Sequence, residues 1–372
     1  MQPAQEFLAP IDVAPPALPK ASVRKNLLDL DPEGLEEALA ELGKEKFRAK
    51  QLLLWVYDKG EDDFSKMSNL AKDFREGLAE KFEIKLPKVV REQKSRDGTV
   101  KWLFEVGGGD TIESVLIPED DRITLCVSSQ VGCAIGCTFC ATAQLGLKRN
   151  LEVWEIVGQL LYAKREAPKF YGPERRLSNV VFMGMGEPLQ NWARLKKVIN
   201  LLESDFAFKI SNRRITVSTS GLVPQIKKLG DESDVNLALS LNASNDEQRQ
   251  KLMPINKAWG MEDLRKALLE FPRPSNRKVT IEYVMLKDVN DSVEDARRLG
   301  GFLRGIPCKV NLIPFNEFKA VNFKTPETET VLKFQAALAA AGYNARIRTP
   351  RGRDISAACG MLQGEHEEEK RA

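Results

Sequence analysis

The chain has 372 residues, of which 42% are hydrophobic and 29% are charged, and its formal net charge is +3. A chain of this length can bury a large core, so we expect one large domain with one or two small ones. No apolar stretch is long enough to span a bilayer and residues 1–20 lack a secretory signal, which predicts a cytoplasmic protein with no membrane partner. The single histidine, His366, lies in an acidic tail, residues 365–372, that we expect to be disordered, so histidine-based catalysis is excluded.

The N-terminal part of the chain contains two segments of different character. Residues 1–22 carry five prolines and are expected to form a flexible extension. Apolar side chains then recur at helical spacing over residues 32–42 and 46–59, and Ser68 is placed to cap a third helix. We expect residues 23–85 to form a helical accessory domain that binds RNA, with simple packing against the rest of the chain as the alternative.

Residues 86–121 change from a helical pattern to an alternating one. Apolar and polar residues alternate after the Asp97-Gly98 turn, and Gly107–Gly109 provides a second turn, so we expect a β-hairpin bridge. Glu113 lies in an apolar stretch of this bridge, where burial would raise its pKa toward the working range of a general base. A strand residue that faces solvent is the alternative for Glu113.

The chain from residue 122 to residue 345 repeats one unit six times, a short apolar strand followed by an amphipathic helix. Such alternation predicts a parallel sheet with helices outside, and right-handed crossovers curl that sheet toward a barrel. Six units are too few for the complete eightfold barrel, so we expect an α/β fold with a partial, open (β/α)6 barrel over residues 122–345. The expected strands are 123–127, 179–183, 214–218, 236–241, 279–285 and 309–313, and the expected helices lie near 153–166, 192–204, 222–229, 261–271, 292–304 and 326–341.

Three cysteines fall within eight residues: Cys133, Cys137 and Cys140. A 4Fe–4S cluster normally takes four thiolates, so three thiolates leave one iron open to a ligand that is not protein. A structural zinc site usually shows two separated Cys-x2-Cys pairs, and this chain has one such pair. We therefore expect one 4Fe–4S cluster on these cysteines, with zinc or inert buried thiols as the alternatives.

The spacing of the three cysteines resembles that of the radical S-adenosylmethionine (SAM) superfamily. The resemblance implies that SAM chelates the open iron and is split by an electron from the cluster. It also implies that the Gly184–Pro188 turn faces the amino group of SAM. Short polar side chains at the ends of several predicted strands suit the rest of SAM, because the carboxyl ends of parallel strands meet at one mouth. The predicted SAM contacts are Gly186, Glu187, Ser218, Ser240, Leu241, Asn242 and Asn316.

Two further cysteines point to one family within the superfamily. Cys126 lies on the first barrel strand, and Cys359 lies in a C-terminal segment, residues 346–364. With Arg351–Ile355 before it, this pair resembles the radical SAM RNA methyltransferases that modify carbon 2 of adenine in large-subunit rRNA and in tRNA. The likeness covers about residues 23 to 364 and includes the motifs Asn26-Leu27-Leu28-Asp29-Leu30, Phe47-Arg48-Ala49-Lys50-Gln51, Ile117-Pro118-Glu119-Asp120-Asp121-Arg122, Tyr283-Val284-Met285-Leu286 and Asn311-Leu312-Ile313-Pro314.

The resemblance implies a cycle that consumes two SAM molecules per turnover. One SAM methylates Cys359, and the radical from the second takes hydrogen from that methyl group, which then adds to adenine and joins protein to RNA. Glu113 is the implied general base. Attack by Cys126 on the Cys359 sulfur releases methyladenine and leaves a disulfide for a thiol reductant. The implied partners are 23S rRNA, tRNA next to the anticodon and a flavodoxin-like electron donor, and the chain is expected to be a monomer.

Several alternatives stay open in the sequence. Asn242 stands where the family usually has histidine, so its contact with SAM departs from the pattern. A related enzyme modifies carbon 8 of the same rRNA adenine, although the helical accessory domain favours the carbon-2 enzyme. A zinc-bearing RNA-binding protein would use Cys126 as a fourth ligand beside the three clustered cysteines. Two basic runs are candidates for RNA contact, with a solvated face as their alternative: Lys85, Lys88, Arg91, Lys94 and Arg96, and Arg346, Arg348, Arg351 and Arg353.

Overall fold

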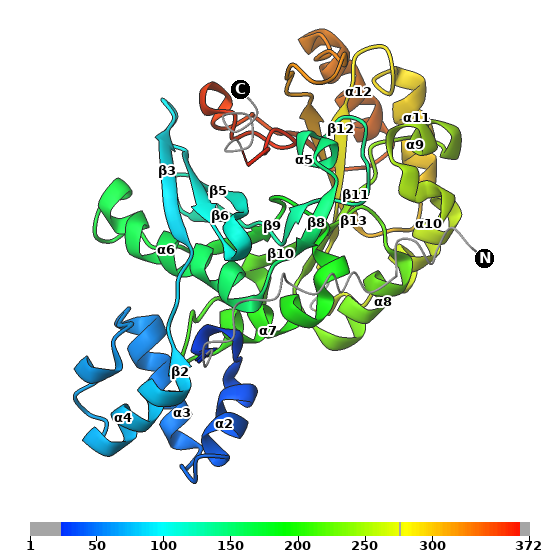
Figure 1. Cartoon of the computed structure of the whole chain (residues 1–372). Coiled ribbons are helices and arrows are strands. Elements are labelled where there is room, and N and C mark those ends of the chain that lie inside the picture. The colour runs from blue at the N-terminus through cyan, green and yellow to red at the C-terminus, as the bar shows by residue number, and fades with distance from the viewer. Residues whose placement is uncertain (1–23, 275–276, 365–372) are drawn as a thin grey trace.

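The computed structural model describes residues 24–274 and 277–364 (Figure 1). The expected flexible extension, the expected acidic tail and His366 therefore lie outside the described residues. In the part of the chain that is described, no helix has the length and apolar character needed to cross a membrane.

A ten-stranded sheet forms the centre of the molecule, in the order β14-β13-β12-β11-β10-β9-β6-β5-β4-β3. Neighbours from β14 to β6 run parallel. The six predicted barrel strands are all present, β14 adds one more at the edge, and the two ends of the order do not pair, so the partial, open barrel is confirmed. The parallel strands are β6 (Ile123–Cys126), β9 (Asn179–Phe182), β10 (Ile215–Thr219), β11 (Asn236–Ser240), β12 (Val279–Met285), β13 (Cys308–Pro314) and β14 (Ala345–Ile347).

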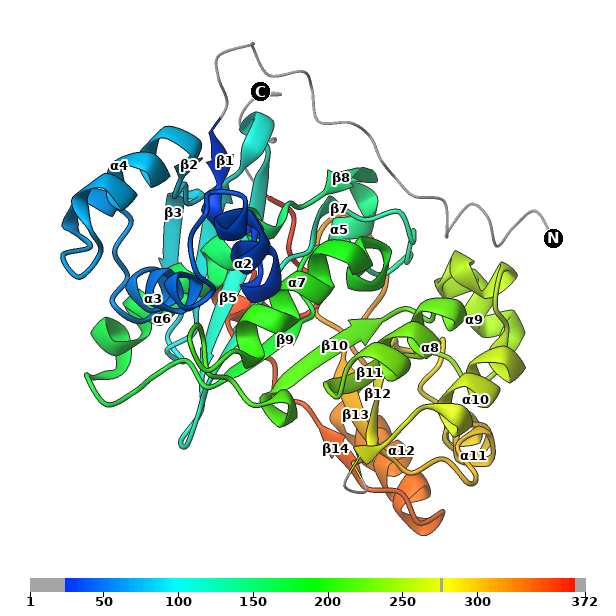
Figure 2. The same cartoon turned by 90° about the horizontal axis from the view of Figure 1, so that it is seen from below.

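Helices lie along the outside of the parallel strands (Figure 2). Local sequence explains their ends: Ser292, for example, accepts the N–H of Asp295 and so begins the helix that follows β12. The predicted helices are α6 (Val153–Tyr171), α7 (Trp192–Glu203), α8 (Val223–Glu232), α10 (Met261–Glu270), α11 (Val293–Phe302) and α12 (Thr328–Ala340). Elements that were not predicted are α5 (Ala141–Gln144), α9 (Asp246–Leu252) and a small antiparallel pair, β7 (Gln130–Gly132) and β8 (Leu147–Asn150).

The expected β-hairpin bridge is a three-stranded antiparallel extension of the same sheet. Its strands are β3 (Lys88–Lys94), β4 (Val100–Glu105) and β5 (Thr111–Pro118), and β5 pairs with β6. Trp102 of β4 packs edge-on against Tyr162 of α6, with ring centroids 5.1 Å apart. The bridge is therefore part of the barrel wall.

The N-terminal helices form a module with a two-residue parallel pair, β1 (Lys25–Asn26) and β2 (Phe82–Glu83). The helices are α2 (Pro32–Ala40), α3 (Phe47–Leu53) and α4 (Lys72–Lys81). The expected cap at Ser68 is wrong, because α4 begins at Lys72 and no side chain caps it. The turn before α4 buries Met67 and Leu70, which fixes the backbone around Ser68 outside the helix.

The helical module docks on the first two barrel helices. Leu27 and Leu28 are buried in the same apolar core as the barrel. The Asp29 carboxylate accepts the N–H of Trp154 at 2.9 Å, where α6 begins, and Asn200 of α7 donates to Asp31 at 2.7 Å. The module and the barrel thus share one core, as expected from the packing alternative.

Candidate active site

The loop after β6 carries the three clustered cysteines. Gly132, the last residue of β7 before the cysteines, has a φ of 77°, and a Cβ there would lie 1.8 Å from the Gly146 carbonyl oxygen, so only glycine fits. The middle of the loop rests on the end of α9, where the Thr138 N–H donates to the Leu252 carbonyl at 3.0 Å. The fold therefore fixes the loop at its base and at its middle.

Cys133, Cys137 and Cys140 are half-buried and pack against one apolar cluster. Burial, reinforced by the neighbouring cysteines, raises the pKa of Cys137 well above its usual value. Across residues 24–274 and 277–364, no three Cys, His, Asp or Glu side chains are already arranged to hold a metal ion. A bound metal keeps a coordinating thiol ionised, so three neighbouring thiols in apolar surroundings fit a metal cluster with cysteine ligands. The apolar cluster contains Ile135, Phe139, Leu222, Leu252, Met253, Ile255, Trp259, Leu286 and Phe315.

The Gly184–Pro188 turn follows β9 and contacts the chain beside the cysteine loop. Gly186 has a φ of 101°, and a Cβ there would lie 2.5 Å from the Cβ of Gln130. The Glu187 carboxylate is 3% exposed and accepts the N–H and the hydroxyl of Ser220 at 2.7 and 2.8 Å. Burial raises the pKa of Glu187. In this structure Glu187 thus connects the ends of β9 and β10.

Other predicted SAM contacts meet at the ends of β10 and β11. The hydroxyls of Ser218 and Ser240 lie 3.5 Å apart on these neighbouring strands, and Leu241 is fully buried. Asn242 has a left-handed backbone with φ of 57°, a conformation that asparagine tolerates better than most residues. Its Oδ1 accepts the Val284 N–H at 2.8 Å. Asn242 stands where the family usually has histidine, and its side chain stabilises the fold through this bond to Val284.

The C-terminal segment lies across the mouth of the barrel (Figure 1). Asn316, at the end of β13, donates to the Cys359 carbonyl at 3.3 Å. On the other side the Ala141 N–H donates to the Gly360 carbonyl at 2.8 Å, and the Thr142 hydroxyl donates to the next turn of the segment. These bonds hold Cys359 between the end of β13 and the start of α5, next to Cys140.

Cys126 lies on β6 and is buried, whereas Cys359 is an exposed residue, although burial of its thiol raises the pKa of Cys359. Burial raises the pKa of Cys126, and the neighbouring Cys359 raises it further. Cys126 pairs with Val115 of β5, the strand whose Glu113 binds the C-terminal segment, so both cysteines belong to the same part of the structure. All six cysteines are free, so the expected disulfide is not supported by this structure.

Glu113 lies on β5 and is 1% exposed, which excludes the solvent-facing alternative. One carboxylate oxygen forms a 2.8 Å ion pair with Lys101 of β4. The other accepts the N–H groups of Gln363 and Gly364 at 2.8 and 3.2 Å. Glu113 is thus joined to the segment that carries Cys359.

Sequence reasoning missed three buried charged residues near this mouth: Lys101, Arg249 and Glu282. Lys101 lies in a strand that is buried on both faces, so alternation of polar and apolar residues did not mark it. Arg249 lies among charged neighbours on a short helix, a pattern that normally indicates a solvated surface. Glu282, on β12, accepts from Asn311 at 2.8 Å, and only its place in an otherwise apolar strand was a signal.

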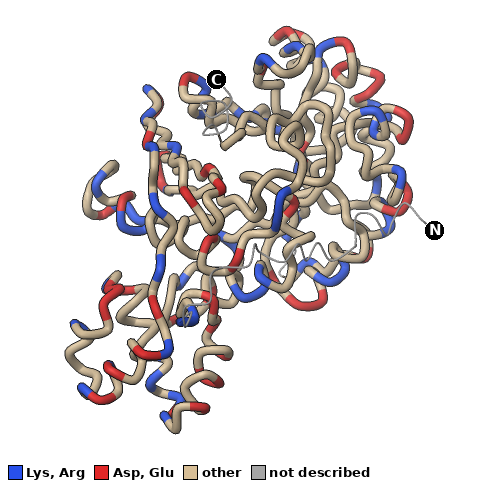
Figure 3. The backbone as a smooth tube through the Cα atoms, in the orientation of Figure 1, with Lys and Arg blue, Asp and Glu red and all other residues tan. Residues whose placement is uncertain are grey.

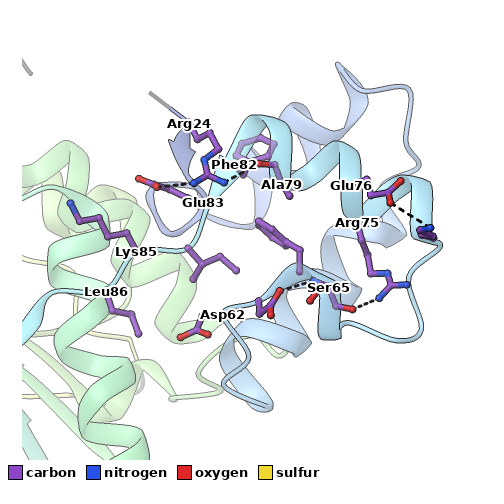
Figure 4. A pocket seen from close by; sticks show the side chains of 14 residues that line it. Arg24, Asp62, Ser65, Arg75, Glu76, Ala79, Phe82, Glu83, Lys85 and Leu86 are labelled. Carbon is purple, nitrogen blue, oxygen red and sulfur yellow. Dashed lines mark hydrogen bonds and ion pairs between the residues drawn. The ribbon is translucent and has the colours of Figure 1, made fainter. Parts of the chain in front are cut away.

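A groove of about 770 Å³ lies in the helical module, away from the cysteines (Figure 4). Arg24 approaches Glu83 to 3.8 Å at one end of the groove. Four Lys or Arg side chains and four Asp or Glu side chains line it, and Figure 3 shows both signs of charge over the whole module. The groove therefore offers no net positive charge to a phosphate backbone.

Comparisons with known proteins agree with this geometry. Models of the ribosomal RNA large subunit methyltransferase N-terminal domain and of the radical SAM superfamily match residues 25–84 and 127–300. The dual-specificity RNA methyltransferase RlmN of Marinobacter nauticus is 46% identical over 353 residues, which cover 94% of this chain and 96% of the relative. The chain belongs to the RlmN family.

Two further comparisons extend the RlmN likeness. RlmN of Rhodospirillum rubrum is 48% identical over 353 residues, which cover 94% of this chain and 82% of the relative. A crystal structure of a radical SAM methyltransferase from Sphaerobacter thermophilus has a TM-score of 0.86 and 43% identity, covering 92% of this chain and all of that one. The predicted family is confirmed. Membership of the radical SAM superfamily implies a 4Fe–4S cluster and SAM, which the three-cysteine loop fits.

Proposed function

We propose that the chain is a radical SAM methyltransferase that adds a methyl group to carbon 2 of adenine in 23S rRNA and in tRNA next to the anticodon. The observation that carries the proposal is the path of the C-terminal segment, which brings the chain around Cys359 to the end of the cysteine loop and to Glu113 on β5, the strand that pairs with β6 and its Cys126. Two free thiols at one mouth suit a mechanism in which the methyl group is first attached to a cysteine and is then transferred to RNA. The dual-specificity RNA methyltransferase name of the relatives supports the substrates and favours carbon 2 over carbon 8.

The cofactors belong to the same proposal. When bound, the cluster supplies the electron that splits SAM, and SAM supplies the methyl group and a carbon radical, with two SAM molecules used per turnover. A flavodoxin-like protein supplies the electron, and the chain acts as a monomer in the cytoplasm. The radical SAM model spans the cysteine loop, which favours an iron–sulfur cluster over the zinc-bearing alternative. The proposed ligands are Cys133, Cys137 and Cys140 for iron, and Gly186, Glu187, Ser218, Ser240, Leu241, Asn242 and Asn316 for SAM.

The chain's own residues divide the remaining work. Cys359, exposed at the mouth, carries the methyl group and stays bonded to the RNA after carbon–carbon bond formation. Glu113 accepts the proton from the ring carbon, and the ion pair with Lys101 holds its carboxylate in place. The unpaired electron left on the ring would return to the cluster. The Cys126 thiolate then attacks the Cys359 sulfur, the bond from that sulfur to the methylene carbon breaks, and this carbon takes up a proton to become the methyl group. The resulting disulfide takes two electrons from a thiol reductant.

RNA contact is proposed along the open side of the barrel. Partial burial lowers the pKa of Lys309, and the nearby charges of Arg346, Arg348 and Arg122 lower it further. These four cations come from β13, β14 and the β5–β6 turn, so they line the gap between the first and last strands of the parallel sheet. Glu282 and Glu119 offset part of this charge, and the exposed cations that remain, such as Arg346, are available to a phosphate backbone.

Two cysteine variants test the cycle. Cys359→Ala should bind the cluster and SAM, yet neither accept a methyl group nor transfer one to RNA. Cys126→Ala should stop after the carbon–carbon bond forms, so the purified protein should carry RNA at Cys359 that survives denaturation and disappears on nuclease treatment. The double variant should carry no RNA. Full turnover by Cys126→Ala, or an adduct on another residue, would overturn the proposal.

A further inference from the structure

Arg249 of α9 is the most deeply buried guanidinium beside the proposed site, with no exposed surface. Nη1 donates to the Asn256 side chain at 3.0 Å, and Nη2 donates to the Ser220 carbonyl. Nε is buried and has no hydrogen-bond partner. A buried arginine normally has all its N–H groups satisfied, so this one is incompletely compensated by the protein.

The charge of Arg249 also lacks a direct counter-charge. Among the residues that the structure describes, no carboxylate lies within ion-pair distance of it. Asp246, which is exposed, reaches it only through Asn256, whose amide donates to Asp246 at 2.9 Å. Burial lowers the pKa of Arg249 to about 10, so the guanidinium remains charged at neutral pH. A buried cation without a counter-charge destabilises the folded protein. Its presence therefore indicates that a bound group supplies a negative charge beside it.

The position of Arg249 indicates what that negative charge is. The helix that carries it ends beneath the cysteine loop, where Leu252 accepts the Thr138 N–H. On its other side, Arg249 donates to Ser220, which itself binds the Glu187 carboxylate through two hydrogen bonds. Arg249 therefore lies between the cysteine loop and the Gly-Glu-Pro turn.

We propose that Arg249 is a positioning residue that compensates the negative charge of the thiolate-bound cluster and so raises its reduction potential. The inference rests on the proposed assignment of Cys133, Cys137 and Cys140 as iron ligands. Three thiolates give the cluster a net negative charge, and the electron that enters it adds one more. A fixed cation in a medium of low polarity favours the reduced state, because it attracts the more negative form more strongly.

The test uses the full chain with its cluster, reconstituted anaerobically and kept free of SAM. Arg249→Gln removes the charge while keeping a side chain that can donate hydrogen bonds, and Arg249→Lys keeps the charge. Lys251→Gln is the matched control, because Lys251 lies on the same helix, is 73% exposed and pairs with Glu247 at the surface. The measurements are the iron content and the midpoint potential of the cluster. The potential is obtained from a redox titration monitored by the electron paramagnetic resonance signal of the cluster.

Arg249→Gln should shift the reduction equilibrium at least tenfold toward the oxidised cluster, which is about 59 mV for a one-electron couple. Arg249→Lys should recover most of the shift, and Lys251→Gln should match the wild type. If Arg249→Gln loses iron while Arg249→Lys retains it, the charge requirement is also supported. An unchanged potential in an iron-loaded Arg249→Gln protein overturns the inference, and so does equal loss of iron in both variants. A wild-type chain that binds no iron would instead defeat the proposed function.

Arg249 has one competing role, recognition of the SAM carboxylate. In that case Arg249→Gln would weaken SAM binding at least tenfold and leave the potential of the SAM-free cluster unchanged. Titrating SAM into the same variants separates the two roles, and that outcome also overturns the inference.

Discussion

Glu113 and Lys101 face each other on β5 and β4, and both side chains are almost completely buried. Removing two charges from water costs several kcal/mol per ion, so each partner of such a pair depends on the other. The pair fixes the Glu113 carboxylate inside an apolar wall, where its other oxygen binds the C-terminal segment. A base that must accept a proton from a ring carbon depends on such positioning.

Removing the cation of this pair should destabilise the chain strongly. Lys101→Met leaves the Glu113 carboxylate buried without its partner, so we expect a loss of about 3–5 kcal/mol in the free energy of unfolding. Chemical denaturation of the metal-free protein measures the loss. Adding Glu113→Gln should recover most of it, because a neutral amide needs no counter-charge. A single variant as stable as the wild type would contradict the buried pair.

The cluster ligands give a second prediction at the scale of single residues. Cys133→Ala, Cys137→Ala and Cys140→Ala should each lose most of the bound iron, since two thiolates hold a 4Fe–4S cluster poorly. Cys126→Ala and Cys359→Ala should keep the iron. Iron analysis and visible absorption after anaerobic reconstitution measure both groups, and wild-type iron content in the first group would refute the ligand assignment.

Residues in a local motif were predictable, and residues defined by distant partners were not. The three clustered cysteines lie within one loop, so their spacing alone predicted a cluster site there. The environment of Glu113 depends on Lys101 and on the backbone of Gln363 and Gly364, which are distant in sequence. Arg249 was missed for the same reason, because the groups around it come from other loops.

At the scale of elements, the C-terminal segment docks on the β3–β4 turn as well as on the barrel mouth. Asp354 accepts the Ser95 hydroxyl at 2.5 Å and the Arg96 N–H at 3.2 Å. Asp97 of the same turn accepts the Gly352 N–H at 2.9 Å. These contacts fix the segment shortly before Cys359, so the turn helps to position the proposed methyl carrier.

Weakening this docking should loosen the segment without unfolding the barrel. Asp354→Ala removes the acceptor of two hydrogen bonds, so amide hydrogen exchange over residues 352–358 should become faster, and methyl transfer should slow. Mass spectrometry of peptides measures the exchange. Glu329→Ala, which breaks an exposed pair with Lys333 on α12, is the control and should change neither. Unchanged exchange in Asp354→Ala would show that the turn does not hold the segment.

The junction between the helical module and α6 should respond to pH. Burial raises the pKa of Asp29 from 3.8 to about 6. A carboxyl whose folded pKa is raised binds more protons in the folded state, so its contribution to stability is lost as pH rises from 3.8 to about 6. Asp29→Asn should remove this loss. The melting temperature of the variant minus that of the wild type should therefore be larger at pH 7 than at pH 4.5. An equal difference at the two pH values would contradict the raised pKa.

Elements with strong periodicity were predicted well, and short or context-dependent ones were not. The six barrel strands and their helices were found close to their true bounds, because apolar runs and amphipathic spacing are local signals. β14 has three residues and too little pattern to be recognised. The pairing of β5 with β6 depends on the barrel and leaves no signal in the local sequence. The bridge was therefore expected to be a hairpin and not part of the main sheet.

For the whole molecule, the basic open side of the barrel provides the test of RNA contact. The helical module shares its core with the barrel, so deleting the module would expose buried leucines. A loss of RNA binding in such a deletion could not be distinguished from a loss of folding. Substitution of a single exposed cation avoids that problem. Arg346 is exposed on β14 and belongs to the group of cations around Lys309.

Arg346→Gln should weaken binding to all RNA sequences alike and reduce the slope of log affinity against log salt by about 1. Fluorescence anisotropy with labelled RNA over a range of salt concentrations measures both quantities. Arg297→Gln on α11 is the matched control, because this exposed arginine pairs with Glu294 on the outer helices. An unchanged slope in Arg346→Gln would place the RNA elsewhere.

The bonds from Gln363 and Gly364 to Glu113 have a consequence for synthesis of the chain. A polypeptide leaves the ribosome from its N-terminus, so the helical module and the first barrel strands emerge before the segment that completes the mouth. An unfinished chain lacks both Cys359 and the groups that bind the proposed base. The proposed activity can therefore begin only once residues 359–364 have been made and have docked on the barrel.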